Sequence, residues 1–264
     1  MPDECERPFN EGVNAQLLLG IVCIGAGVGL LAGALGKGGS AVSTPLLHAI
    51  GVPAMVAVAS PLPATIPSTW WAGRTYARED QVDGRIVRLG LLVGVPATVA
   101  GAVLTRWIPG GSLVLATDAL VLLIGMRVLA GANAAPVPAT EPAAVAGRAV
   151  TVAVVAAAGV ASGLLGNSGG FLLAPLFVTV LHLPVRRALG TSLALATALA
   201  VPGTIVHAWL GHIDWSITLA FGLAAVPLAG LGARLAFRMR ERPLTLAFGT
   251  ALTLLAGGLL VFAH

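Results

Sequence analysis

Charged side chains are scarce in this sequence, since only 10% of its 264 residues are Asp, Glu, Lys or Arg. A typical soluble domain carries about 25% charged residues, so the composition excludes an ordinary water-soluble protein. Lys37 is the only lysine, and the two cysteines lie in a polar N-terminal segment (Cys5) and in an apolar run (Cys23), which makes a disulfide framework implausible. Residues 1–14 are acidic, whereas a signal peptide begins with positive charge, so we expect no cleaved leader.

Motifs for nucleotide, metal and covalent chemistry are also missing. Residues 33–38 come near a phosphate-binding Gly-x-x-x-x-Gly-Lys-Ser/Thr loop, but the spacing is wrong and the flanks are apolar. The five histidines are scattered, without a metal-ligand cluster or a nucleophile beside a base. We therefore expect no catalytic residue, no metal and no cofactor. Arginines in loops explain the pI near 10.0, so we expect no nucleic-acid partner.

Long apolar runs are what the sequence has instead. Hydrophobic residues make up 57% of the chain, and runs long enough to cross a bilayer recur from end to end. They predict an all-α, polytopic membrane protein, in which residues 1–264 form a single transmembrane domain surrounded by lipid. The expected helical segments are 15–35, 41–50, 54–71, 86–104, 112–129, 149–165, 171–181, 188–210, 215–235 and 244–263, with a charged loop over residues 72–85.

The two halves of the chain align with each other at an offset of about 130 residues, as expected for the internal repeats of transporters. The first repeat covers residues 15–130 and the second 149–263, with a Pro-rich cytoplasmic linker over 131–148. Each repeat contains a broken, glycine-rich helical hairpin and three further transmembrane helices. The matched residues in order are Gly33 and Gly163, Gly36 and Gly166, Gly39 and Gly169, Pro45 and Pro175, Ala59-Ser60 and Thr191-Ser192, Asp83 and Asp214, Pro96 and Pro227, and Gly101 and Gly232.

The distribution of arginine predicts the orientation. If the acidic N-terminus is outside, most of the 15 basic residues fall in inside loops, as the positive-inside rule requires. Both termini are then periplasmic, and the second repeat is inverted relative to the first. Whether each broken hairpin crosses the membrane or dips in and returns stays open.

The two glycine-rich breaks are the candidate substrate site. A short helix starts after each break, and the free N–H groups and positive dipole of a helix N-terminus favour an anion. Lys37 adds a full positive charge, which is costly inside a membrane unless an anion compensates it. The candidate substrate-binding residues are Gly36, Lys37, Gly38, Gly39, Ser40, Thr44, Gly166, Asn167, Ser168, Gly169 and Gly170 in the hairpins, and Ser60, Thr191 and Ser192 on the helices that follow.

Asp118 lies within an apolar segment and is the candidate for proton coupling, because an intramembrane carboxylate is often a proton carrier. A structural hydrogen bond to a neighbouring helix is the alternative. For Ser60, Thr191 and Ser192, the alternative to lining the path is hydrogen bonding between helices. For the two breaks, the alternative to an anion site is that the glycines only allow close helix packing and that the side chain of Lys37 extends to the membrane interface.

The pattern Gly33-x-x-Gly36-x-Gly38-Gly39-x-x-x-x-x-Pro45, repeated with small changes from Gly163 to Pro175, resembles the duplicated glycine-rich motif of the TauE/SafE sulfite exporter family. The resemblance covers roughly residues 15 to 262. It implies a bacterial inner-membrane transporter of sulfur-containing anions such as sulfite, thiosulfate or organosulfonates. The chain departs from the pattern at Lys37, Ser40 and the proline-dense residues 60–63. A homodimer stays open.

Three other classes remain as alternatives. A cation exchanger needs acidic residues within the membrane, and only Asp118 qualifies. A membrane enzyme needs a metal cluster or an activated nucleophile. Broken helices argue against a membrane scaffold, because unwound backbone at membrane depth is tolerated only where it lines a cavity or is buried in protein. These arguments favour a secondary transporter driven by an ion gradient, most simply of protons.

Overall fold

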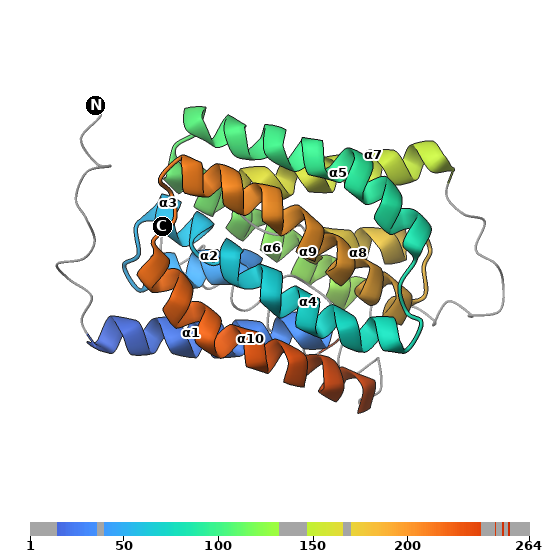
Figure 1. Ribbon diagram of the computed structural model, residues 1–264, viewed down its shortest axis with the longest axis horizontal. Coiled ribbons are helices and arrows are strands. Elements are labelled where there is room, and N and C mark those ends of the chain that lie inside the picture. Colours follow the sequence, from blue (N-terminus) through green and yellow to red (C-terminus); the bar gives the residue numbers. More distant parts are fainter. Residues whose placement is uncertain are drawn as a thin grey trace.

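The computed structural model describes residues 15–35, 40–131, 147–165 and 170–238, together with residues 246, 250 and 253 (Figure 1). The described chain is helical and contains no strand, so the predicted all-α class is confirmed. The elements in order are α1 (Ala15–Leu35), α2 (Ser40–Ala49), α3 (Ala54–Ala59), α4 (Leu62–Arg78), α5 (Gly84–Leu104), the 3-10 helix η2 (Thr105–Trp107), α6 (Gly110–Gly131), α7 (Arg148–Leu164), α8 (Gly170–Thr179), α9 (Val185–Trp209) and α10 (Trp215–Arg238).

Four helices in the described part of the chain are long and apolar enough to cross a bilayer: α1, α5, α9 and α10. Large apolar side chains point outward from them, including Leu92 on α5 and Leu223 on α10, which are 73% and 78% exposed. Exposed apolar side chains suit a lipid environment better than water. Exposed tryptophans also occur, as in the aromatic belts at membrane interfaces. Trp107, Trp209 and Trp215 lie at helix ends, whereas Trp70 and Trp71 lie within α4.

Helix α1 of the first half packs closely against α10 of the second (Figure 1). A methyl group added at Gly33 would overlap the carbonyl oxygen of Ala229, and one added at Gly29 would overlap that of Ala225. Small residues at every fourth position let two helix backbones approach closely in a membrane, where packing replaces the hydrophobic effect as the force between helices. The glycines of α1 are therefore required by the contact with α10.

Helices α5 and α7 make the same kind of contact on the opposite edge of the bundle in Figure 1. A methyl group at Gly163 would overlap the carbonyl oxygen of Thr98, and one at Gly159 would come within 2.7 Å of that of Gly94. Gly163 aligns with Gly33 of the first half, and Thr98 aligns with Ala229 of the second. Aligned residues thus make corresponding contacts, each between a helix of one half and a helix of the other.

Between these two pairs lie α4 and α9, which pack against each other. The hydroxyl oxygens of Thr69 and Thr197 are 2.8 Å apart across this contact, close enough to share a hydrogen bond. Left-handed backbone conformations also recur at aligned positions. Gly51 and His182 form one such pair, with φ of 96° and 52°, and Asp80 and Gly211 form the other, with φ of 54° and 74°.

The helix predicted over residues 54–71 is wrong in outline. It consists of two helices, because α3 ends at Ala59 and α4 begins at Leu62. Pro61 and Pro63 each lack the N–H that a continuous helix would need at that position. The second half has serine and alanine at the aligned positions, and its helix α9 runs unbroken from Val185 to Trp209.

The charged loop predicted over residues 72–85 is also too long. Helix α4 continues to Arg78, and its last turns are amphipathic. Ala72 and Tyr76 are buried, whereas Arg74 and Arg78 are exposed, so residues four apart share a face. The arginines are accommodated on the outer face of a helix, and only residues 79–83 remain as a loop. Residues 132–146 of the predicted linker lie outside the described residues, as does the segment 244–263 apart from residues 246, 250 and 253.

Candidate functional site

The two predicted glycine-rich breaks fall between described helices. Helix α1 ends at Leu35 and the short helix α2 begins at Ser40; helix α7 ends at Leu164 and the short helix α8 begins at Gly170. Both short helices thus start directly after their breaks. Eight of the predicted substrate-binding residues lie outside the described residues: Gly36, Lys37, Gly38, Gly39, Gly166, Asn167, Ser168 and Gly169.

Helices α2 and α8 are too short to cross a bilayer. Each has 10 residues and would extend ~15 Å, about half the hydrocarbon thickness. Their side chains are nevertheless well buried, with Ser43 and Thr44 fully buried on α2, and Leu173 and Phe177 fully buried on α8. Helix α2 packs on α3 and α6, and α8 packs on α9. Both half-length helices therefore bury side chains against other parts of the protein.

Ser60 and Thr191, which correspond at the offset of 131 residues that relates Asp83 to Asp214, make matching contacts across the two halves. The backbone N–H of Asp214 donates to the hydroxyl of Ser60, and the backbone N–H of Asp83 donates to that of Thr191, both at 2.9 Å. Asp83 and Asp214 in turn accept hydrogen bonds from the first N–H groups of α5 and α10. The two hydroxyls thus tie each half to the start of a helix in the other.

Two buried side chains at aligned positions reach the helix turns that precede the breaks. Tyr76 on α4 donates through its hydroxyl to the carbonyl of Ala34 at 3.4 Å, and Nε2 of His207 on α9 lies 3.1 Å from the carbonyl of Gly163. Tyr76 was not among the predicted site residues. Its signal in the sequence is that it is the only tyrosine of the chain and aligns with His207.

His207 also contacts His212, which lies in the loop before α10; their Nδ1 atoms are 3.1 Å apart. Because the carbonyl of Gly163 can only accept, Nε2 of His207 carries a proton and, in a neutral ring, Nδ1 is the acceptor. His212 then donates from its own Nδ1. Burial lowers the pKa of His212, which favours its neutral form at pH 7. The pair forms a hydrogen-bonded connection from the loop to the turn before the second break.

The remaining predicted site residues are distributed over several helices. Thr44 is buried on α2, and Ser192 on α9 donates to the carbonyl of Leu189 at 2.8 Å. Ser40 and Gly170 are the first residues of α2 and α8. Asp118 lies on α6, but its side chain is outside the described part of the structure. A role for these residues in binding or coupling stays a prediction.

Among the described residues, no group of three or more His, Cys, Asp or Glu side chains lies close enough together to hold a metal ion. Arg187 and Asp83 form an ion pair at 3.5 Å, with side chains 48% and 20% exposed, which links the start of α9 to the loop before α5. Such exposed pairs contribute little to stability.

Comparison with known proteins identifies the family. The model of the sulfite exporter TauE/SafE family matches residues 21–259. A probable membrane transporter protein of Xylella fastidiosa (strain 9a5c) is 31% identical over 229 residues, which cover 83% of this chain and 85% of the relative. The probable membrane transporter protein YjnA of Bacillus subtilis is 23% identical over 85% of this chain and 92% of its own length. No solved structure matches.

The matched region contains both glycine-rich segments and, within the described residues, the ten α-helices apart from the first residues of α1. The apolar helices and the names of the relatives agree with this assignment. The protein is thus a multi-pass membrane protein, and the chain belongs to the TauE/SafE sulfite exporter family of membrane transporters.

Proposed function

We propose that the protein is a secondary-active transporter of small sulfur-containing anions, such as sulfite, thiosulfate or organosulfonates, which bind between the two breaks. The observation that carries the proposal is that α2 and α8 begin directly after the breaks, at Ser40 and Gly170. Their free N–H groups and helix dipoles favour an anion there. Lys37, in the sequence of the first break, supplies a full positive charge.

The proposal includes an inverted repeat. Its support is that corresponding residues of the two halves make corresponding contacts. Gly33 packs against α10 and Gly163 packs against α5. Ser60 accepts from the N–H of Asp214, and Thr191 accepts from the N–H of Asp83. In transporters of this build, the substrate site lies where the broken helices of the two repeats meet near the membrane midplane. Each half would then contribute one helix N-terminus to the same anion.

The proposed orientation puts both termini outside, in the periplasm of a bacterium, and the linker inside. Arginines from three helices gather at one end of the described bundle, which supports this orientation under the positive-inside rule. Arg78 of α4 and Arg234 of α10 line the same pocket, Arg186 of α9 lies over the ring of Phe237 on α10, and Arg187 of α9 pairs with Asp83. A cysteine introduced in the loop 79–83 should therefore resist impermeant thiol reagents in intact cells. Labelling from outside would reverse the topology.

The substrate class is tested by binding and then by flux. Sulfite, thiosulfate, sulfoacetate, taurine and sulfate are compared by their effect on the thermal unfolding of purified protein, because a ligand that binds only the folded state raises its unfolding temperature. We expect at least one sulfur anion to stabilise the protein and to be transported into proteoliposomes, whereas chloride at the same ionic strength should have no effect. Equal responses to all anions would refute a specific site.

Proton coupling through Asp118 is the second part of the proposal. Asp118→Asn keeps the size of the side chain but cannot bind and release a proton, so it should abolish flux driven by a pH gradient while leaving anion binding intact. Asp80→Asn, in the exposed loop after α4, is the matched control and should behave like the parent. If flux through Asp118→Asn keeps the pH dependence of the parent, Asp118 is structural.

A further inference from the structure

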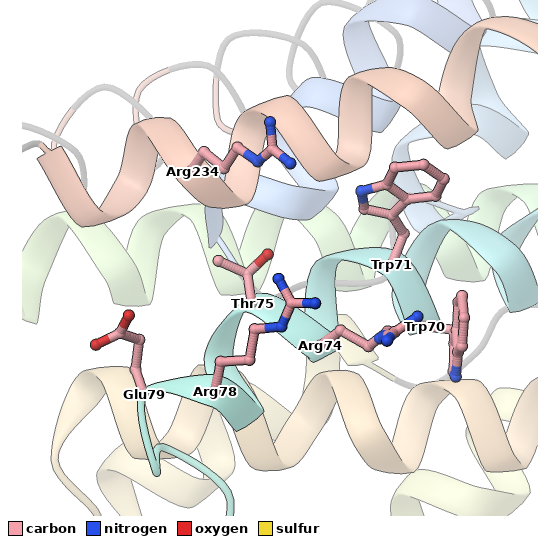
Figure 2. A pocket seen from close by; sticks show the side chains of 7 residues that line it. All are labelled: Trp70, Trp71, Arg74, Thr75, Arg78, Glu79 and Arg234. Carbon is pink, nitrogen blue, oxygen red and sulfur yellow. The ribbon is translucent and has the colours of Figure 1, made fainter.

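A basic pocket lies on the outer surface of the bundle between α4 and α10 (Figure 2). Its volume is about 310 Å³, and it opens outward. Figure 2 shows Arg78 and Thr75 directed from α4 toward α10, Arg74 extended toward Trp70, and Glu79 at the far end. The complete lining is Trp70, Trp71, Arg74, Thr75, Arg78, Glu79 and Arg234.

The pocket carries an excess of positive charge. Three guanidinium groups line it against the single carboxylate of Glu79. Within the part of the chain that the structure describes, no carboxylate forms an ion pair with Arg74, Arg78 or Arg234. Planar guanidinium groups bind phosphate oxygens through paired N–H donors, so three of them around one cavity favour a phosphate-bearing ligand.

The pocket lies at the level of a membrane interface. Helix α10 begins at the exposed Trp215, and at 1.5 Å per residue Arg234 lies ~29 Å further along the helix, about the thickness of the hydrocarbon core. Trp70 and Trp71, which are 51% and 48% exposed, mark the same level on α4. The guanidinium carbon of Arg74 stands 4.7 Å from the ring centre of Trp70, a cation–π contact that holds this arginine beside the pocket.

An apolar stripe leads from the pocket along α10 toward the middle of the membrane. Leu231 and Leu223, one and three turns before Arg234 on the same face, are 46% and 78% exposed. Gly230 lies on this face too, and the indole of Trp71 packs directly against it, so that the two helices meet without a bulky side chain between them. A phosphate in the pocket would therefore have a continuous apolar surface beside it, as an acyl chain requires.

We propose that the Arg74, Arg78 and Arg234 pocket binds the phosphate headgroup of an anionic phospholipid, with an acyl chain along Leu231 and Leu223. A free anion on its way to the transport path would need the charges but not the exposed apolar stripe. The lipid bridges α4 and α10, two helices from opposite halves that already contact each other. This site is separate from the glycine-rich breaks and does not depend on which anion the protein transports.

Native mass spectrometry of the purified protein with added phosphatidylglycerol tests the proposal, with phosphatidylcholine of the same acyl chains as the uncharged comparison. Each arginine near an anionic membrane surface contributes about 1 kcal/mol, or roughly a fivefold ratio in affinity. Arg74→Gln and Arg234→Gln should each weaken phosphatidylglycerol binding by roughly fivefold, and the double variant by roughly 25-fold. Arg88→Gln is the matched control, an exposed arginine on α5 outside the pocket, and should bind like the parent.

Three results would overturn the proposal. The first is that the double variant binds phosphatidylglycerol as tightly as the parent. The second is that the parent binds phosphatidylcholine as tightly as phosphatidylglycerol. The third is that inorganic phosphate and sulfite alone stabilise the parent against thermal unfolding as much as the lipid does, and lose this effect in the double variant. The last result would make the pocket a site for free anions. Because the arginines substituted are exposed, the variants should fold, and lipid-free thermal unfolding verifies this.

Discussion

Gly33→Ala should prevent stable folding or lower the unfolding temperature more than any other single methyl addition to α1. The added methyl group would overlap the carbonyl oxygen of Ala229 on α10. Backbone atoms cannot rotate away as a side chain can, so α1 and α10 would have to separate along their whole contact. Overpacking of this kind costs roughly 3 kcal/mol or more, a large part of the stability of a typical domain.

Gly27→Ala is the matched control on the same helix, because a methyl group at Gly27 meets nothing within 4 Å. It should leave the unfolding temperature unchanged or raise it slightly, because alanine in a helix interior is more favourable than glycine by about 0.5–1 kcal/mol. Both variants are compared by the yield of monodisperse protein and by thermal unfolding in the same detergent. Equal stability of the two would mean that α1 and α10 are not packed backbone to backbone at Gly33.

Lys37→Ala should weaken anion binding by roughly 10- to 100-fold. A charge-assisted hydrogen bond is worth about 1.5–3 kcal/mol, and each ~1.4 kcal/mol is a tenfold ratio in affinity. The variant should still fold, because removing a cation from an apolar segment relieves a cost of ~2.5–3.5 kcal/mol. Lys37→Arg should bind less well than conservation of charge suggests, since a guanidinium fork is larger than a break formed by glycines accommodates.

The measurement is the affinity for the best sulfur anion of the panel, by isothermal titration calorimetry on parent and variants. Arg106→Ala provides the control, since it removes an exposed cation next to Trp107 at a helix end and should leave the affinity unchanged. If Lys37→Ala binds as tightly as the parent, Lys37 is not a ligand. The helix N-termini after the breaks would then carry the anion alone.

The hydrophobic pattern determined the class of this protein and most of its helix boundaries. Runs of apolar residues require a lipid environment, and in lipid the backbone must satisfy its own hydrogen bonds, which leaves helices as the solution for such runs. The helix ends before the two predicted breaks also follow from the sequence, because α1 and α7 end within one residue of the positions expected. The local pattern predicts a loop from residue 72, but Arg74 and Arg78 instead occupy the exposed face of helix α4.

The amino-acid sequence by itself determined the membrane class, the ends of α1 and α7 and the alignment of the halves, because each follows from residue type and spacing along the chain. Only the tertiary structure decided which helix each half packs on and what the aligned polar residues contact. Ser60 and Thr191 receive N–H groups that are remote in sequence, and Tyr76 and His207 reach the turns before the breaks. Such partners depend on how whole helices cross, and helix crossing is set by close packing at residues such as Gly33 and Gly163 rather than by any local signal.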